Sequence, residues 1–66
     1  MNGFNLVYHN EQVAWYETEQ EAVIGAAELW EVTGLTSVLD MYIISDDGDV
    51  TIRDEDLVAR IRTCGL

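Results

Sequence analysis

The chain of 66 residues has no lysine and no proline, and it has one cysteine and one histidine. With Cys64 as the only cysteine no disulfide can form within the chain, and Cys64 and His9 are too few ligands for a Cys/His metal site. Linkers and low-complexity runs are also absent, so one domain covering residues 1–66 is predicted. No apolar run approaches the ~20 residues that a bilayer span needs, and the start lacks the basic region of a secretory signal. A cytoplasmic location is therefore expected.

The sequence also has few basic residues. Thirteen Asp and Glu residues face three arginines, which gives a formal net charge of −10. Nucleic acid and anionic membranes would repel such a surface, so neither is expected to be a direct partner. A basic protein, in particular one that binds nucleic acid, is the expected partner. A different interpretation is that the acidity is only a solubility or halophilic trait.

Residues for catalysis are scarce as well. His9 is expected in an exposed hairpin turn, and Cys64 near the C-terminal end of a helix, where the partial negative charge raises a thiol pKa. Acid–base catalysis by two carboxylates needs a cleft that buries them unequally, and a domain of this size offers little room for one. We therefore predict that the protein is not an enzyme and needs no cofactor.

Alternating apolar residues predict strands over residues 4–9 and 13–16, joined by a turn at Asn10 and Glu11. Thr18 and Glu21 fit a capping box, in which the Thr18 hydroxyl accepts from the Glu21 amide and the Glu21 carboxylate reaches back. The helix that begins there has an apolar stripe of Val23, Ala26, Ala27 and Trp30. It is predicted to end at Gly34 in a left-handed conformation.

The second half repeats this order. Residues 38–44 are rich in β-branched side chains and predict a strand, which an Asp-Gly turn at 46–49 connects to a fourth strand containing Val50 and Ile52. Asp54 is expected to cap a short final helix that Gly65 ends. The predicted fold class is α+β with the order ββαββα, a four-stranded antiparallel sheet with two helices packed on one face.

The carboxylates themselves are the best candidates for function. On the first helix, Glu21, Glu28 and Glu31 share a face opposite the apolar stripe, with Glu17 just before the cap and Ile24 among them. A second patch consists of Asp46, Asp47 and Asp49 in the second hairpin. Carboxylates in a row on a rigid helix can imitate the charges of a phosphate backbone. Charge runs of this kind are also often nothing more than a solvated surface.

Gly25 and Tyr16 each have a structural and a functional interpretation. Ile24 and Gly25 interrupt the acidic face. A glycine inside a helix costs about 1 kcal/mol relative to alanine, so either a strand of this chain or a partner is expected to approach closely at Gly25. Trp15, Tyr16 and Trp30 are expected in the core, although Tyr16 could instead be an interface anchor.

The segment 43–54 matches a calcium-binding loop only in its second half. Gly48 takes the position of the loop glycine, but Ile43 and Ser45 occupy the first two ligand positions. A tight hairpin turn explains the same residues, so no metal site is predicted. Weak divalent-ion binding by the Asp-rich hairpin is an open alternative.

Three parts of the chain together resemble two groups of small proteins. These parts are the hairpin over residues 6–16, the segment Thr18-Glu19-Gln20-Glu21-Ala22 leading into an Ala-rich helix, and residues 41–52. One comprises acidic bacteriophage inhibitors, among them DNA mimics, anti-restriction and anti-CRISPR proteins and inhibitors of host RNA polymerase. The other comprises small bacterial ββαββ domains without assigned function. The resemblance lies in size, charge and architecture, and it implies an inhibitory binding role.

We therefore expect a non-enzymatic binding protein, of the phage-inhibitor or DNA-mimic type, whose acidic face occupies the basic groove of a nucleic-acid-handling protein. The alternative is a small structural or adaptor domain whose acidity is only a solubility or halophilic trait. Such a domain could be a homodimer, because apolar burial between two copies would supplement a small core.

Overall fold

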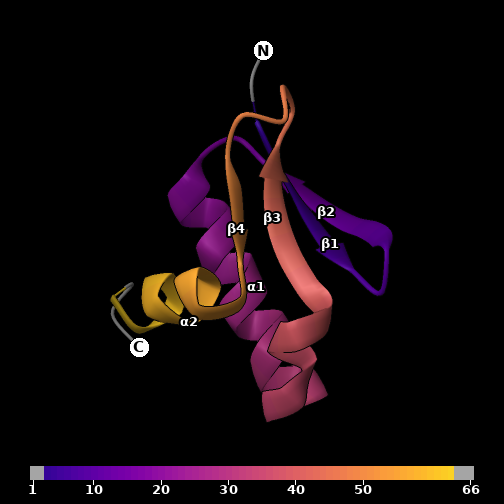
Figure 1. Cartoon of the computed structure of the whole chain (residues 1–66), viewed down its shortest axis with the longest axis vertical. Helices are drawn as coiled ribbons and strands as arrows, with labels where there is room; N and C mark the ends of the chain where they lie inside the picture. The colour runs from indigo at the N-terminus through magenta and orange to yellow at the C-terminus, as the bar shows by residue number, and fades with distance from the viewer. Residues whose placement is uncertain (1–2, 64–66) are drawn as a thin grey trace.

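The computed structural model describes residues 3–63 and has the predicted α+β fold (Figure 1). The elements are β1 (Phe4–Tyr8), β2 (Glu11–Tyr16), α1 (Glu19–Thr33), the 3-10 helix η1 (Leu35–Asp40), β3 (Met41–Ser45), β4 (Thr51–Arg53) and α2 (Asp54–Thr63). Cys64 and Gly65, which were expected at the end of the last helix, lie outside the described residues.

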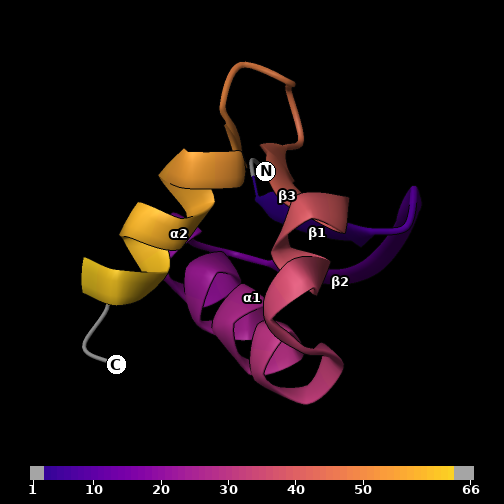
Figure 2. The same ribbon diagram turned by 60° about the horizontal axis from the view of Figure 1, so that its bottom comes forward.

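The four strands form one antiparallel sheet in the order β2-β1-β3-β4, so β2 and β4 are its edges. Leu6 of β1 pairs with Ile43 of β3, which pairs with Ile52 of β4, and these three buried side chains together with Met41 of β3 form the sheet's share of the core. Both helices pack against this core, and Figure 2 shows them side by side.

The start of α1 follows the predicted capping box. The Thr18 hydroxyl accepts a hydrogen bond from the Glu21 amide at 3.2 Å and lies 3.1 Å from the Glu21 carboxylate. The predicted apolar stripe faces the core, and its alanines let the helix lie close to the sheet. The helix ends at Gly34, whose φ of 105° is positive as predicted, but its ψ of 166° places the residue outside the left-handed helical region.

Both hairpin turns use positive φ angles. The first turn is formed by His9 and Asn10, with φ of 54° and 66°, one residue earlier than the predicted turn. His9 is exposed, as expected, and its Nδ1 lies 4.0 Å from Asp40. In the second hairpin Gly48 has φ of 78°, as the Asp-Gly signature predicted.

The predicted strand over residues 38–44 begins too early. Residues 35–40 form η1, and the strand starts at Met41. The Ser37 hydroxyl donates to the Gly34 carbonyl at 2.6 Å, which stabilises a tight turn where β propensity alone favoured a strand. Val38 is buried all the same, because η1 packs against the helices and β3.

The prediction that Trp15 lies in the core is wrong. Trp15 is paired with Asn5 on the sheet face away from the helices and is 44% exposed. Tyr16 points to the opposite face and packs against the core. Because side chains alternate along a strand, only one of two consecutive aromatic residues can face the core.

Candidate functional site

The predicted acidic face of α1 is present in the structure. Glu21, Ile24, Glu28 and Glu31, here called the acidic helix face, are all exposed on α1, and Glu17 is exposed just before it. Ile24 keeps 43% of its surface exposed among these carboxylates. Val32, one turn beyond Glu28, is 84% exposed; sequence analysis did not single it out, although its spacing of seven from Gly25 could have placed it on this side of the helix.

Negative charge is concentrated in the first part of the chain. Residues 1–52 contain ten Asp and Glu residues and no Lys or Arg, whereas residues 53–66 contain three acidic residues and all three arginines. The whole formal charge of −10 therefore comes from residues 1–52. The acidic helix face has no cation on its own element or on the three strands and loops before residue 53.

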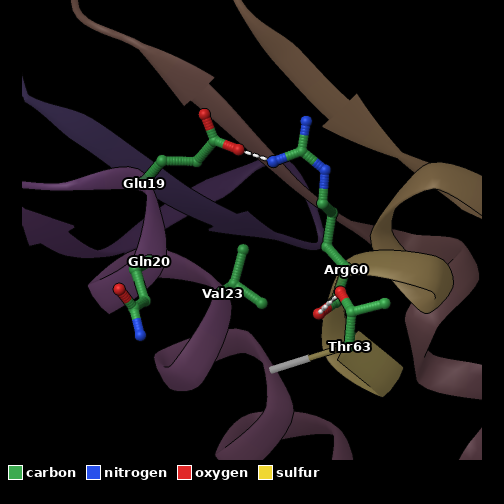
Figure 3. Close-up of a pocket in the computed structure, with 5 residues that line it drawn as sticks. All are labelled: Glu19, Gln20, Val23, Arg60 and Thr63. Carbon is green, nitrogen blue, oxygen red and sulfur yellow. Dashed lines mark hydrogen bonds and ion pairs between the residues drawn. The ribbon is translucent and has the colours of Figure 1, made fainter. Parts of the chain in front are cut away.

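One carboxylate of α1 is nevertheless compensated. Arg60, in the last turn of α2, forms an ion pair with Glu19 in the first turn of α1 (Figure 3). The two residues close one end of a shallow cavity of about 350 Å³ between the helices, whose floor includes Val23. Within residues 3–63, by contrast, the Glu28 and Glu31 side chains take part in no ion pair or hydrogen bond.

Asp46, predicted as part of a partner-binding patch, is a structural anchor of the sheet. Its carboxylate accepts hydrogen bonds from the Gly3 amide at 2.8 Å, from the Asn5 side chain at 2.8 Å and from the Trp15 indole at 3.2 Å. These donors lower the pKa of the Asp46 carboxyl below its ordinary value of 3.8, because they stabilise the charged form. The network extends across β1 to Gln12, which donates to Asn5.

Asp47 has a similar internal role in the second hairpin. It accepts hydrogen bonds from the Ser45 hydroxyl at 2.6 Å and from the Asp49 amide at 3.1 Å, and these lower the pKa of its carboxyl. The Ser45 hydroxyl in turn accepts from the Val50 amide, which closes the turn. The hairpin geometry thus accounts for two of the three aspartates of the predicted second patch, while Asp49 stays exposed.

Gly25 has a structural explanation. A Cβ at this position would lie 2.1 Å from the Tyr16 hydroxyl and 2.4 Å from the adjoining ring carbon, so the glycine lets the Tyr16 ring lie against α1. The strand that approaches the helix is β2, in agreement with the structural interpretation of this residue. Beside this contact a groove of about 320 Å³ runs between β2 and α1, with Val13, Ala14 and Glu28 among its lining residues.

A larger hollow of about 660 Å³ lies between η1 and α2 and is mainly apolar, with Val38, Leu39 and Val58 on its walls. It extends to Thr63, the last described residue, and it contains no pair of groups arranged for catalysis. A search of residues 3–63 finds no group of three or more His, Cys, Asp and Glu residues that could hold a metal ion.

No helix in the described part of the chain is long and apolar enough to cross a membrane. A scan against protein-family models, a search of curated proteins and a search of solved structures each found no match to the chain.

Proposed function

We propose that this protein is a non-enzymatic binding protein whose acidic helix face docks into the basic groove of a nucleic-acid-binding protein and competes there with DNA or RNA. Glu21, Glu28 and Glu31 supply the charge, and Ile24 supplies an apolar contact among them. Interfaces commonly combine such an apolar centre with a polar rim. Glu17 and the exposed Asp49 add negative potential at a longer range.

The observation that carries this proposal is the position of Glu31. It lies in the last turn of α1, where the helix dipole disfavours an anion, and it is three residues from Glu28, which repels it. No cation of the described chain compensates either residue. These carboxylates work against the stability of their own helix, so a role outside the fold explains their presence better than a role within it.

The spacing of the carboxylates also fits the proposed competitor. Glu21 and Glu28 are seven residues apart, which is about 10 Å along a helix at ~1.5 Å per residue. Three successive phosphate-to-phosphate intervals of a DNA strand cover a similar length along the duplex axis, at ~3.4 Å each. A rigid α1 can therefore present charges at intervals that a phosphate-binding groove accommodates.

The test compares two double variants that change the net charge equally. Glu28→Gln/Glu31→Gln neutralises the acidic helix face, and Glu55→Gln/Asp56→Asn neutralises two exposed carboxylates in the first turn of α2. Tagged proteins are used to capture partners from a cytoplasmic lysate, with elution by a salt gradient and identification by mass spectrometry. We expect the wild type and the α2 variant to release a basic nucleic-acid-binding protein at moderate salt, and the α1 variant to retain none. Equal capture by all three proteins would refute the proposal.

The alternative, a homodimeric structural or adaptor domain, is favoured by the exposed Val13 and Val32. A dimer held by apolar burial would persist at high salt, because screening weakens charge–charge attraction but not the hydrophobic effect. Sedimentation at low and at high ionic strength separates the two functions. A mass that corresponds to two chains at both salt concentrations would favour the dimer.

A further inference from the structure

The groove between β2 and α1 combines three features: exposed apolar side chains, an open strand edge and nearby negative charge. Val13, Ala14 and Tyr16 line it from the strand, and Gly25, Leu29 and Val32 line it from the helix. Two of these apolar side chains are far from buried, since Val13 is 50% and Val32 is 84% exposed. The groove is therefore an incompletely covered apolar surface.

A β-bulge produces this surface. Leu6 pairs with Ala14 and the next residue, Val7, pairs with Gln12, so Val13 has no partner in β1. The extra residue interrupts the alternation of side chains, and Val13 lines the groove on the helix side together with its neighbour Ala14.

The second feature is the outer edge of β2. This strand is the last in the sheet, and no described element lies beside its outer edge in Figure 1. The outward main-chain N–H and C=O groups of an edge strand can pair with an added strand. An occupant that uses both the apolar groove and this edge has to be an extended segment, because a helix has no main-chain groups free for pairing.

The third feature is charge, which decides the kind of occupant. Glu28 lies on the rim of the groove, and Glu11 and Glu17 stand at the two ends of β2. A second copy of the chain would bring another charge of −10 to this edge, and a symmetric antiparallel pairing centred on Ala14 would put Glu11 of one copy opposite Glu17 of the other. A segment with Lys or Arg side chains would find complementary charge at both ends and along the helix.

We propose that the edge of β2 and the groove beside α1 bind an extended segment of a partner protein in which apolar residues alternate with Lys or Arg. The segment adds a fifth strand to the sheet, its apolar side chains cover Val13 and Val32, and its basic side chains reach Glu28 and the glutamates at the ends of β2. This inference rests on the proposed function in one respect, namely that the partner is basic, and it names the part of the partner that is recognised.

The experiment uses the full chain labelled with ¹⁵N and a blocked peptide of about nine residues, which is within the usual range of strand lengths, in which Val and Lys alternate. A control peptide of equal charge has proline at the central valine, which removes a main-chain donor and disfavours the extended ladder. We expect the first peptide to shift the amide signals of residues 11–16 and to protect those amides that point away from β1. The proline peptide should bind at least about tenfold more weakly, as the loss of main-chain hydrogen bonds implies.

A protein variant provides the matching control. Val13→Asn/Val32→Gln removes apolar surface from the groove at two exposed positions and leaves the charge unchanged. We expect it to bind the alternating peptide about tenfold more weakly, with an unchanged far-ultraviolet spectrum.

Three outcomes would overturn the inference. Equal binding of both peptides, with amide shifts confined to the exposed side of α1, would leave the proposed function standing and remove strand addition. Self-association that Val13→Asn/Val32→Gln abolishes would make a second copy the occupant. No binding of the alternating peptide, together with capture of a basic protein that depends on Glu28 and Glu31, would show that only the acidic helix face is used.

Discussion

The two helices pack on the same side of the sheet but differ in how their charges and their inner faces are arranged. In α2, acidic residues fill the first turn and Arg60 and Arg62 occupy the last turn, as the helix dipole favours. In α1, Glu19 and Glu21 begin the helix in the same manner, yet the last turn has no basic residue and contains Glu31. The charge pattern of α2 and that of the first turn of α1 can be explained by the stability of the helix, whereas Glu31 in the last turn of α1 cannot.

Their inner faces differ in size as well. The buried residues of α1 are small, namely Ala22, Val23, Ala26 and Ala27, whereas α2 buries Leu57 and Ile61. Small residues allow α1 to lie close to the sheet, and Gly25 extends this close approach to Tyr16 at the edge. The short α2 gains its contact from two large side chains instead. The close packing of α1 against the sheet leaves the acidic helix face exposed on the other side of the helix.

The largest expected effect comes from removing the small residue that allows this approach. Gly25→Ala should destabilise the protein by about 1–3 kcal/mol, because the added methyl would overlap the Tyr16 ring. The same Gly25→Ala change should have the opposite effect in a Tyr16→Ala background, where no ring is overlapped. There it should stabilise the protein by up to about 1 kcal/mol, because alanine has a higher helix propensity than glycine. Urea denaturation of the four proteins measures both effects. A change of equal size in the two backgrounds would mean that Gly25 has another role.

A smaller effect of the opposite sign is expected at the end of α1. Glu31→Gln should stabilise the fold by about 0.3–1 kcal/mol, because it removes an anion from the negative end of the helix and its repulsion with Glu28. The matched change in α2, Arg62→Gln, should destabilise the fold by a similar amount, since it removes a cation from the corresponding turn. Thermal unfolding at low salt measures both changes, and high salt should reduce them. If Glu31→Gln destabilised the protein, Glu31 would have a partner within the fold and the basis of the proposed function would be lost.

The smallest effect is expected from the carboxylates that serve the fold, since Asp46 and Asp47 are exposed to solvent, which screens their interactions. Their pKa values are lowered in the folded protein, so the stability that they contribute is complete above the ordinary value of 3.8 and is lost as the pH falls through and below that value. Asp46→Asn should therefore lose stability at pH 6 and differ less from the wild type below pH 3. Parallel denaturation curves of the two proteins at all pH values would contradict this assignment.

Local signals in the sequence predicted most of the fold. The capping box at Thr18, the positive φ of Gly34 and Gly48, and the alternation in β1 all depend on residues close together in the chain. The start of β3 could not be predicted in this way. Val38 has high β propensity, but the hydrogen bond from Ser37 to Gly34 and the burial of Val38 favour η1 instead.

The residues of the candidate site likewise differ in whether local sequence was enough to predict their role. The helical spacing of Glu21, Glu28 and Glu31 was enough to place them on one exposed face, and the structure has them there. The role of Asp46 was not predictable, because its donors come from Gly3, Asn5 and Trp15, which are more than thirty residues away in the chain. Only the pairing of β1 with both β2 and β3 brings them together.

The sequence by itself determined the net charge, its concentration before residue 53, the Thr18 cap, the Asp-Gly turn, and the order of the strands and α-helices, because these depend on composition and on neighbours in the chain. The tertiary structure decided which carboxylates are tied into the fold, which sheet face carries Trp15, and where apolar surface stays uncovered. The physical reason is strand register: one bulge opposite Leu6 and Val7 changes the side on which Val13 lies, and no local pattern in the chain specifies that pairing.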